Sequence, residues 1–162
     1  MNDLSLYELL PVALEVLQLG KEASFVPDGR SMLPTIFGGK SEVVVVKPTF
    51  PLKKYDIALY TSPSGFLVLH RVIDVCNYNG KTEYILRGDN TYKNEVGVTN
   101  NQILAVVTRF KRKNRWQSVN ARGYLFFVKL WCGIYPLRKA TRFFALLVVR
   151  AVRKTKRTVF KK

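Results

Sequence analysis

The chain has 162 residues and a mass of 18.6 kDa, a length typical of one domain that can bury its own core. Its composition, 48% hydrophobic and 23% charged, excludes a wholly disordered polyelectrolyte, although the formal net charge is +16. Residues 1–108 hold 10 basic and 11 acidic residues, whereas residues 109–162 hold 17 basic and no acidic ones, so the two parts contribute −1 and +17. A near-neutral body therefore precedes a cationic C-terminal segment.

Neither end of the sequence has the pattern of a secretory signal peptide or of a membrane-spanning helix. The N-terminus has no basic region, and Glu8 and Glu15 interrupt its apolar residues, so we expect no secretory signal peptide. The longest charge-free stretches near the C-terminus, 130–137 and 143–149, are shorter than the roughly 18 apolar residues that a spanning helix needs. We therefore expect no transmembrane helix.

The two cysteines, Cys76 and Cys132, are far apart in the sequence. Their spacing matches neither a zinc site nor the dense framework of a disulfide-rich secreted domain. We expect two buried free thiols rather than a disulfide, and neither a metal nor a cofactor.

The first predicted element is a helix. Ser5-Leu6-Tyr7-Glu8 is a capping-box pattern, and apolar residues then recur at helical spacing up to Gly20, where we expect the helix to stop. Pro11 either delays its start or kinks it.

From Glu22 to Arg115 the sequence consists of short β-branched and aromatic runs separated by turn residues. These runs predict strands near 24–26, 42–47, 57–62, 65–78, 82–87 and 102–113. Turn sequences at 63–65 and 77–80 predict hairpins and hence antiparallel pairing. The fold class is therefore mainly β with flanking helices: a coiled, mostly antiparallel sheet or small barrel.

After Arg115 the pattern predicts helices, with Pro136 dividing a piece at 121–133 from one that runs from about Leu137 to the end. Basic residues of the second piece share one face, opposite an apolar face. We thus divide the chain into a body, 1–118, and a basic amphipathic tail, 119–162. Residues 138–162 are best suited to an anionic membrane surface; a solvated helix docked on the body is the alternative, and nucleic acid is the least favoured partner.

One serine is a candidate nucleophile. Ser31 lies between Gly29 and Pro34, in a turn that could hold its hydroxyl outward. A serine hydroxyl needs a neighbouring base, and the single histidine of the chain, His70, is embedded in a predicted strand. A histidine base works better beside a carboxylate, for which the candidates are Asp56, Asp89 and Glu95. Asp56 is also well suited to a structural turn.

Four short segments occur in the order of the motifs of the LexA/signal peptidase-like superfamily of serine endopeptidases. Gly29-Arg30-Ser31-Met32-Leu33-Pro34 resembles the nucleophile motif, and 54–60 resembles the Gly-Asp-Ile-Val strand. His70-Arg71-Val72-Ile73 resembles the base motif, and Gly88-Asp89-Asn90 resembles the Gly-Asp-Asn motif. Four motifs in order are a more specific signal than any one alone.

The resemblance implies that Ser31 is the nucleophile and His70 the general base, with Asp89 and Glu95 as orienting or charge-stabilising groups. Histidine at this position is typical of the endoplasmic-reticulum and archaeal signal peptidases, whereas bacterial signal peptidases and LexA-type repressors use lysine. Glu95 stands where the histidine-type enzymes place a second Asp. The backbone N–H of Ser31 would hold the oxyanion, and Arg30, Met32 and Pro34 would support that loop.

These observations together predict a serine endopeptidase that cleaves an extended peptide through an acyl-enzyme at Ser31, after small residues as in the family. The motifs that carry the prediction span residues 29–90. A catalytically inactive peptide-binding or membrane-tethering module of the same fold is the alternative. We expect a small bacterial protein that is peripheral to the membrane or cytoplasmic.

Overall fold

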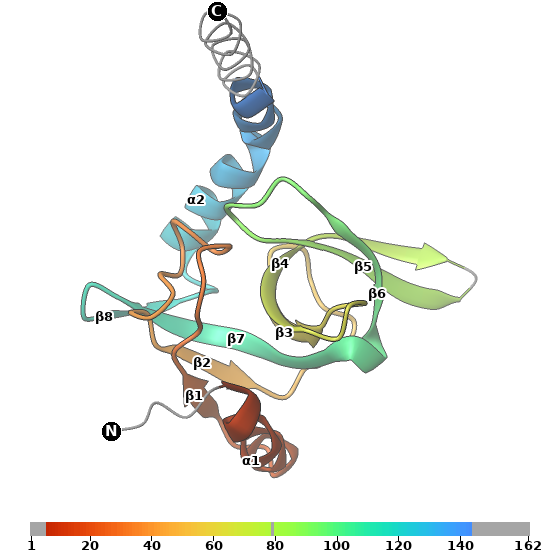
Figure 1. The fold of residues 1–162 in the computed structure, drawn as a ribbon, viewed down its shortest axis with the longest axis vertical. Helices are drawn as coiled ribbons and strands as arrows, with labels where there is room; N and C mark the ends of the chain where they lie inside the picture. The colour runs from red at the N-terminus through yellow and green to blue at the C-terminus, as the bar shows by residue number, and fades with distance from the viewer. Residues whose placement is uncertain (1–5, 79, 144–162) are drawn as a thin grey trace, which may run out of the picture. The chain divides into compact units, whose positions relative to one another are not determined.

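The computed structural model describes residues 6–78 and 80–143 and is mainly β (Figure 1). Its strands are β1 Ala23–Phe25, β2 Val43–Val46, β3 Ile57–Thr61, β4 Leu67–Tyr78, β5 Lys81–Arg87, β6 Glu95–Thr99, β7 Ile103–Arg112 and β8 Arg115–Ser118. The helices are α1 Leu6–Gln18, the 3-10 turn η1 Asn100–Gln102 and α2 Arg122–Gly133.

All eight strands belong to one antiparallel sheet, in the order β1-β2-β7-β3-β4-β5-β6, with β8 added to β7. The sheet curls strongly, and β3 and β4 lie on the inside of the curl (Figure 1). Because β1 and β6 end the strand order, the sheet is not closed into a barrel. The prediction of a mainly β, antiparallel fold is confirmed, and the alternative of a closed small barrel is wrong.

The predicted turn at 63–65 forms the β3–β4 hairpin. Ser62 N–H donates to the carbonyl of Phe66 and Gly65 N–H donates to that of Ser62, while Gly65 has a φ of +83° that favours glycine. This turn fixes the register in which Ala58 lies opposite His70. The hairpin therefore sets the position of the histidine relative to β3.

The core lies inside the curled sheet, where β-branched and aromatic side chains from alternating positions meet. Its buried members are Leu52, Ala58, Tyr60, Val72, Tyr84, Leu86, Val98 and Ile103. Two of these are tyrosines, whose hydroxyls need partners when buried. Tyr84 satisfies this need by accepting from the backbone N–H of Leu52 and donating to Asn100.

Two strands were not predicted. The polar residues and Gly97 in β6 mask its alternation, and β8 begins at Arg115, after which the sequence predicts no further strand. The turn between β7 and β8 has Lys113 at φ 47° and Asn114 at φ 61°, a pair typical of tight hairpins. Pairing with β7, a tertiary effect, decides the conformation of β8.

The predicted helices in the described range are present: α1 contains Pro11, and α2 agrees with the prediction at 121–133. A break at Ile134 separates α2 from further helix at 135–143. The rest of the predicted basic helix, 144–162, lies outside the described residues. Within the part that is described, no helix is long and apolar enough to cross a membrane.

Chain contacts group the protein into two compact units, Met1–Lys129 and Leu130–Lys162. The first unit holds the whole sheet and the beginning of α2, from which Tyr124 and Val128 are buried. Neither cysteine is in a disulfide, as predicted, but Cys76 is exposed and Cys132 is only partly buried. The prediction of buried thiols is wrong, because Cys76 lies on the outer half of β4, beyond the core.

Candidate active site

Ser31 lies in the loop between β1 and β2, residues 26–42, which we call the serine loop. The loop closes on itself: Gly39 N–H donates to the Pro27 carbonyl at 2.8 Å, and Gly38 packs directly against Gly29. A Cβ on Gly38 would lie 2.0 Å from the Gly29 oxygen, so only glycine fits there. Gly29 itself has a φ of +86°. The serine loop is therefore held by its own backbone.

The three residues predicted to support the loop have different positions. Met32 is buried, and its carbonyl accepts from the N–H groups of Thr35 and Ile36, which makes a helical turn after the serine. The peptide bond between Leu33 and Pro34 is cis. The Arg30 side chain is exposed, but its carbonyl accepts from the Asn90 side-chain amide at 3.2 Å.

His70 lies next to the serine loop in space. Gly88 is the point of closest approach: a Cβ on Gly88 would lie 2.6 Å from the Ser31 carbonyl oxygen and 2.9 Å from His70 Nε2. In addition, Asn90 N–H donates to the Ser31 carbonyl at 2.7 Å. The segment 88–90 thus holds the serine loop against the histidine, and only glycine leaves room at position 88.

A hydrogen-bonded chain holds the other side of the imidazole. The Tyr60 hydroxyl lies 3.1 Å from His70 Nδ1 and donates to Glu95 Oε2 at 2.6 Å. A phenol has one proton, and because Tyr60 gives it to Glu95, its oxygen accepts from the Nδ1–H of His70. Neutral His70 therefore carries its proton on Nδ1 and an unprotonated Nε2 toward Gly88 and the serine loop.

The surroundings of His70 also favour its neutral form. Burial lowers the pKa of His70 from its ordinary value of 6.5, and the nearby charges of Glu95 and Asp89 oppose that shift. Glu95 Oε1 lies 3.8 Å from Nδ1, close enough to stabilise an imidazolium if one forms. Burial and the bond to Glu95 raise the pKa of Tyr60, so its hydroxyl stays protonated.

Asp89 has a different set of partners from Glu95. Its two oxygens accept from Arg71 Nε at 2.7 Å and Nη2 at 2.6 Å, and Oδ2 also accepts from the Thr35 hydroxyl at 2.5 Å. The Arg71 and Asp89 side chains are 0% and 1% exposed. Since Thr35 belongs to the serine loop, this buried ion pair ties the loop to β4.

Asp56, the remaining carboxylate considered from the sequence, lies in a turn. Its Oδ2 accepts from the backbone N–H of Lys53 at 2.7 Å, and Tyr55 beside it has a φ of 82°. Burial raises the pKa of Asp56. Its contacts fit the turn role that the sequence suggested.

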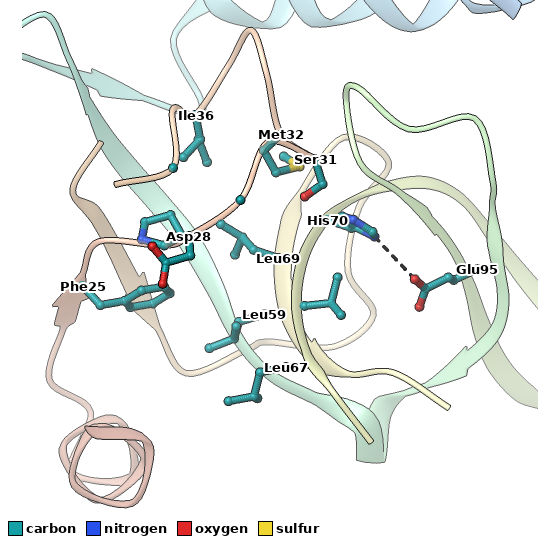
Figure 2. A pocket seen from close by; sticks show the side chains of 14 residues that line it. Phe25, Asp28, Ser31, Met32, Ile36, Leu59, Leu67, Leu69, His70 and Glu95 are labelled. Carbon is teal, nitrogen blue, oxygen red and sulfur yellow. Dashed lines mark ion pairs between the residues drawn. The ribbon is translucent and has the colours of Figure 1, made fainter. Parts of the chain in front are cut away.

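Ser31, His70 and Glu95 line one cavity of about 430 Å³ (Figure 2). Its other side chains are mainly apolar and come from the serine loop and from β1, β3 and β4: Phe25, Met32, Ile36, Leu59, Leu67, Val68 and Leu69. No hydrogen bond joins the Ser31 hydroxyl to His70, and the backbone N–H of Ser31 donates to no group in the described part of the chain. That N–H is therefore available to a bound group.

The described residues contain no group of three or more His, Cys, Asp or Glu that could hold a metal ion. No protein-family model matches the chain, and no curated protein and no solved structure shows significant similarity to it. The residues of the cavity are therefore the basis for a functional assignment.

Sequence reasoning missed Tyr60, Arg71 and Thr35 as parts of the site. A signal for Tyr60 was present, since the tight turn at 63–65 pairs β3 with β4 so that Tyr60 and His70 share one face of the sheet. Arg71 belongs to the motif around His70, but its role was not predicted, because its carboxylate partner comes from a separate loop.

Proposed function

We propose that this chain is a serine endopeptidase in which Ser31 is the nucleophile and His70 the general base. The observation that carries the proposal is the state of the imidazole: Tyr60 and Glu95 hold the proton on Nδ1, which leaves the Nε2 lone pair beside the serine loop. A base must present a lone pair to the hydroxyl that it activates. The order of the sequence motifs supports the same assignment and favours a fold of the LexA/signal peptidase type.

In this reaction Ser31 Oγ attacks the carbonyl carbon of a peptide bond while its proton passes to His70 Nε2. The negative charge develops on the carbonyl oxygen, where the free N–H of Ser31 donates to it. His70 then gives the proton to the leaving amine, and an acyl-enzyme remains on Ser31. Water, deprotonated by Nε2, hydrolyses the ester and restores the serine.

Glu95 stabilises the positive charge that His70 carries between these steps. Its second oxygen is 3.8 Å from Nδ1, whereas Asp89 is already paired with Arg71. We therefore assign Glu95 and Tyr60 to the histidine, and Asp89 to the position of the serine loop.

The substrate that fits this site is an extended peptide. Apolar side chains dominate the cavity around Ser31, so an uncharged residue is expected on the acyl side of the cleaved bond. The family resemblance points to small residues there.

The test is cleavage of a peptide library by the purified protein, with products mapped by mass spectrometry. Ser31→Ala and His70→Ala are expected to lose cleavage by at least about 10³-fold, since each removes one half of the activated nucleophile. Ser64→Ala, which changes an exposed serine in the β3–β4 turn, is the matched control and should retain wild-type activity. Equal activity in the Ser31 variant would contradict the proposal.

A non-catalytic peptide-binding module is the second candidate, and one observation favours it: the Ser31 hydroxyl and His70 share no hydrogen bond. It predicts a stable complex of wild-type protein with uncleaved peptide. Labelling by a fluorophosphonate separates the two candidates, because only an activated Ser31 reacts with it.

We further propose that residues 138–162 bind an anionic membrane surface and give the protein a peripheral location. Their basic sequence is the support. Replacing Arg153, Lys154, Lys156 and Arg157 by Gln should release the protein from vesicles that contain anionic lipid. Release of the wild type and the variant at the same salt concentration would count against this role.

A further inference from the structure

A second hollow, of about 380 Å³, lies between the serine loop and the β7–β8 hairpin. It shares no lining residue with the cavity around Ser31. Four cationic side chains line it: Lys40 from the serine loop, and Lys111, Arg112 and Lys113 from the hairpin. We call it the basic pocket.

The charge of the basic pocket is poorly compensated. No carboxylate lines it, and the acid that contacts one of its residues, Glu42, lies 4.0 Å from Lys111. In the described part of the chain, Lys40 and Lys113 form no ion pair. Like charges that line one pocket repel one another, so a bound anion would stabilise the arrangement.

The pocket also contains a hydroxyl that can donate a hydrogen bond. Ser41 is only 3% exposed, and its oxygen accepts from the backbone N–H of Phe37 at 3.1 Å. Its own proton has no acceptor among the described residues. A buried hydroxyl without an acceptor, surrounded by cations, is suited to bind an anion's oxygen.

Several contacts hold the hairpin that carries three of the cations. Its tip is a tight turn with positive φ at Lys113 and Asn114, and β8 pairs with β7 along its length. Arg112 lies over the Phe37 ring at 6.0 Å and Lys111 over the Trp116 ring at 5.9 Å. These contacts preorganise the cations on one side of the pocket.

We propose that the basic pocket binds a phosphate group, either free phosphate or the phosphomonoester of a lipid headgroup. A phosphate dianion offers several strong acceptor oxygens, which suits cations that approach from two segments together with a hydroxyl donor. Because Phe37, Lys40 and Ser41 belong to the serine loop, the bound phosphate bridges that loop to the hairpin. The inference is independent of whether Ser31 is catalytic.

The first test is a titration of the full-length, ¹⁵N-labelled protein with inorganic phosphate at constant ionic strength, with chloride as the reference anion. Amide resonances of residues 37–41 and 111–114 are expected to shift with phosphate and not with chloride. Equal shifts with both anions would overturn the proposal.

The second test compares two double variants that lose the same charge. Lys40→Gln with Lys113→Gln removes the two unpaired cations and should weaken phosphate binding by at least about tenfold, given the usual strength of charge-assisted hydrogen bonds. Lys81→Gln with Lys93→Gln changes exposed lysines elsewhere and should weaken it by less than about twofold. All four lysines are exposed, so both variants should fold. Equal weakening in the two variants would show a non-specific charge effect and overturn the site.

A third measurement distinguishes the two sources of phosphate. Vesicles of phosphatidylcholine with phosphatidic acid present a phosphomonoester at a membrane surface, and the cationic tail is unchanged in both double variants. If the source is a lipid headgroup, the Lys40/Lys113 variant binds these vesicles more weakly than the Lys81/Lys93 variant. If the source is free phosphate, the two variants bind vesicles alike and still differ in the phosphate titration.

Discussion

Tyr60 decides which nitrogen of His70 carries the proton of the neutral imidazole. Its hydroxyl is buried between His70 Nδ1 and Glu95 Oε2, and its single proton goes to the carboxylate. In many serine hydrolases a carboxylate accepts directly from the imidazole. Here the neutral phenol of Tyr60 accepts from the imidazole, and the carboxylate of Glu95 lies behind it and binds the phenol.

Tyr60→Phe removes the acceptor for Nδ1–H and leaves the ring in the core. We expect kcat to fall by about 10²-fold with little change in KM, a loss in the range typical of general-base catalysis. Since His70 is the single histidine, the ¹⁵N spectrum of labelled imidazole reports its tautomer without overlap. Wild type should show an unprotonated Nε2, and the variant should gain the opposite tautomer. An unchanged tautomer would show that Tyr60 does not position the base, whatever the activity.

On the proposed mechanism, the pH dependence of cleavage follows from the pKa of His70. Burial lowers this pKa below 6.5, so the acid limb of kcat/KM should have its midpoint below 6.5. Glu95→Gln keeps an acceptor for Tyr60 but removes the charge that favours imidazolium, so the midpoint should move to still lower pH. A midpoint that rises in this variant would contradict the assignment of Glu95.

The lowered pKa of His70 also makes the free energy of unfolding depend on pH. The unfolded chain binds a proton at His70 near pH 6.5 and the folded chain binds it only at lower pH. The free energy of unfolding therefore decreases as the pH falls from 6.5 through the folded pKa, and this contribution is complete above 6.5.

At the scale of elements, two consecutive residues of strand β4, His70 and Arg71, contribute to different parts of the site. Neighbouring side chains of a strand point to opposite faces, so His70 lines the cavity while Arg71 is buried against Asp89 and the hydroxyl of Tyr124. Asp89 in turn binds Thr35 of the serine loop. One strand thus positions both His70, the proposed base, and the loop that carries Ser31, the proposed nucleophile.

Asp89→Asn leaves Arg71 as a buried charge without its carboxylate partner. We expect a loss of about 3–5 kcal/mol in the free energy of unfolding, the usual cost of breaking a buried ion pair. Glu22→Gln breaks the pair with Arg109, which has a similar distance of 2.7 Å but is about half exposed, and should cost less than about 1 kcal/mol. Urea unfolding at neutral pH measures both, and similar losses would show that burial does not set the strength of the Arg71 pair.

At the scale of the whole molecule, the first compact unit ends at Lys129, eleven residues beyond the boundary that the sequence suggested at 118. Those residues contain three buried side chains, Val119, Tyr124 and Val128. Tyr124 packs edge-on against Phe110 at 5.4 Å and accepts a hydrogen bond from Arg71. The start of α2 is therefore part of the body.

A chain that ends at Lys129 should keep the urea midpoint of the full-length protein, because the core of the sheet lies within 1–129. In a chain that ends at Ser118, the free energy of unfolding should fall by several kcal/mol. Each fully buried side chain that is removed contributes about 1.5–3 kcal/mol. Equal stability of the two truncated chains would show that α2 does not complete the body.

The sequence by itself determined the features that depend on neighbours along the chain. The strands from β1 to β5 and β7, the hairpin turn at 63–65, the first helix and the glycine and proline around Ser31 were all recognisable, because alternation and turn chemistry are local. The motif order also selected Ser31 and His70 as candidates, and the structure places both at one cavity.

Only the tertiary structure decided how the carboxylates are used. Asp89 and Glu95 are six residues apart and equally acidic in the sequence, yet one is paired with Arg71 and the other is linked to His70 through Tyr60. Strands β6 and β8 and the basic pocket likewise depend on segments that meet only in the fold. The physical reason is that hydrogen bonding and burial assign a role to a charged group, and both depend on partners that are remote in the chain.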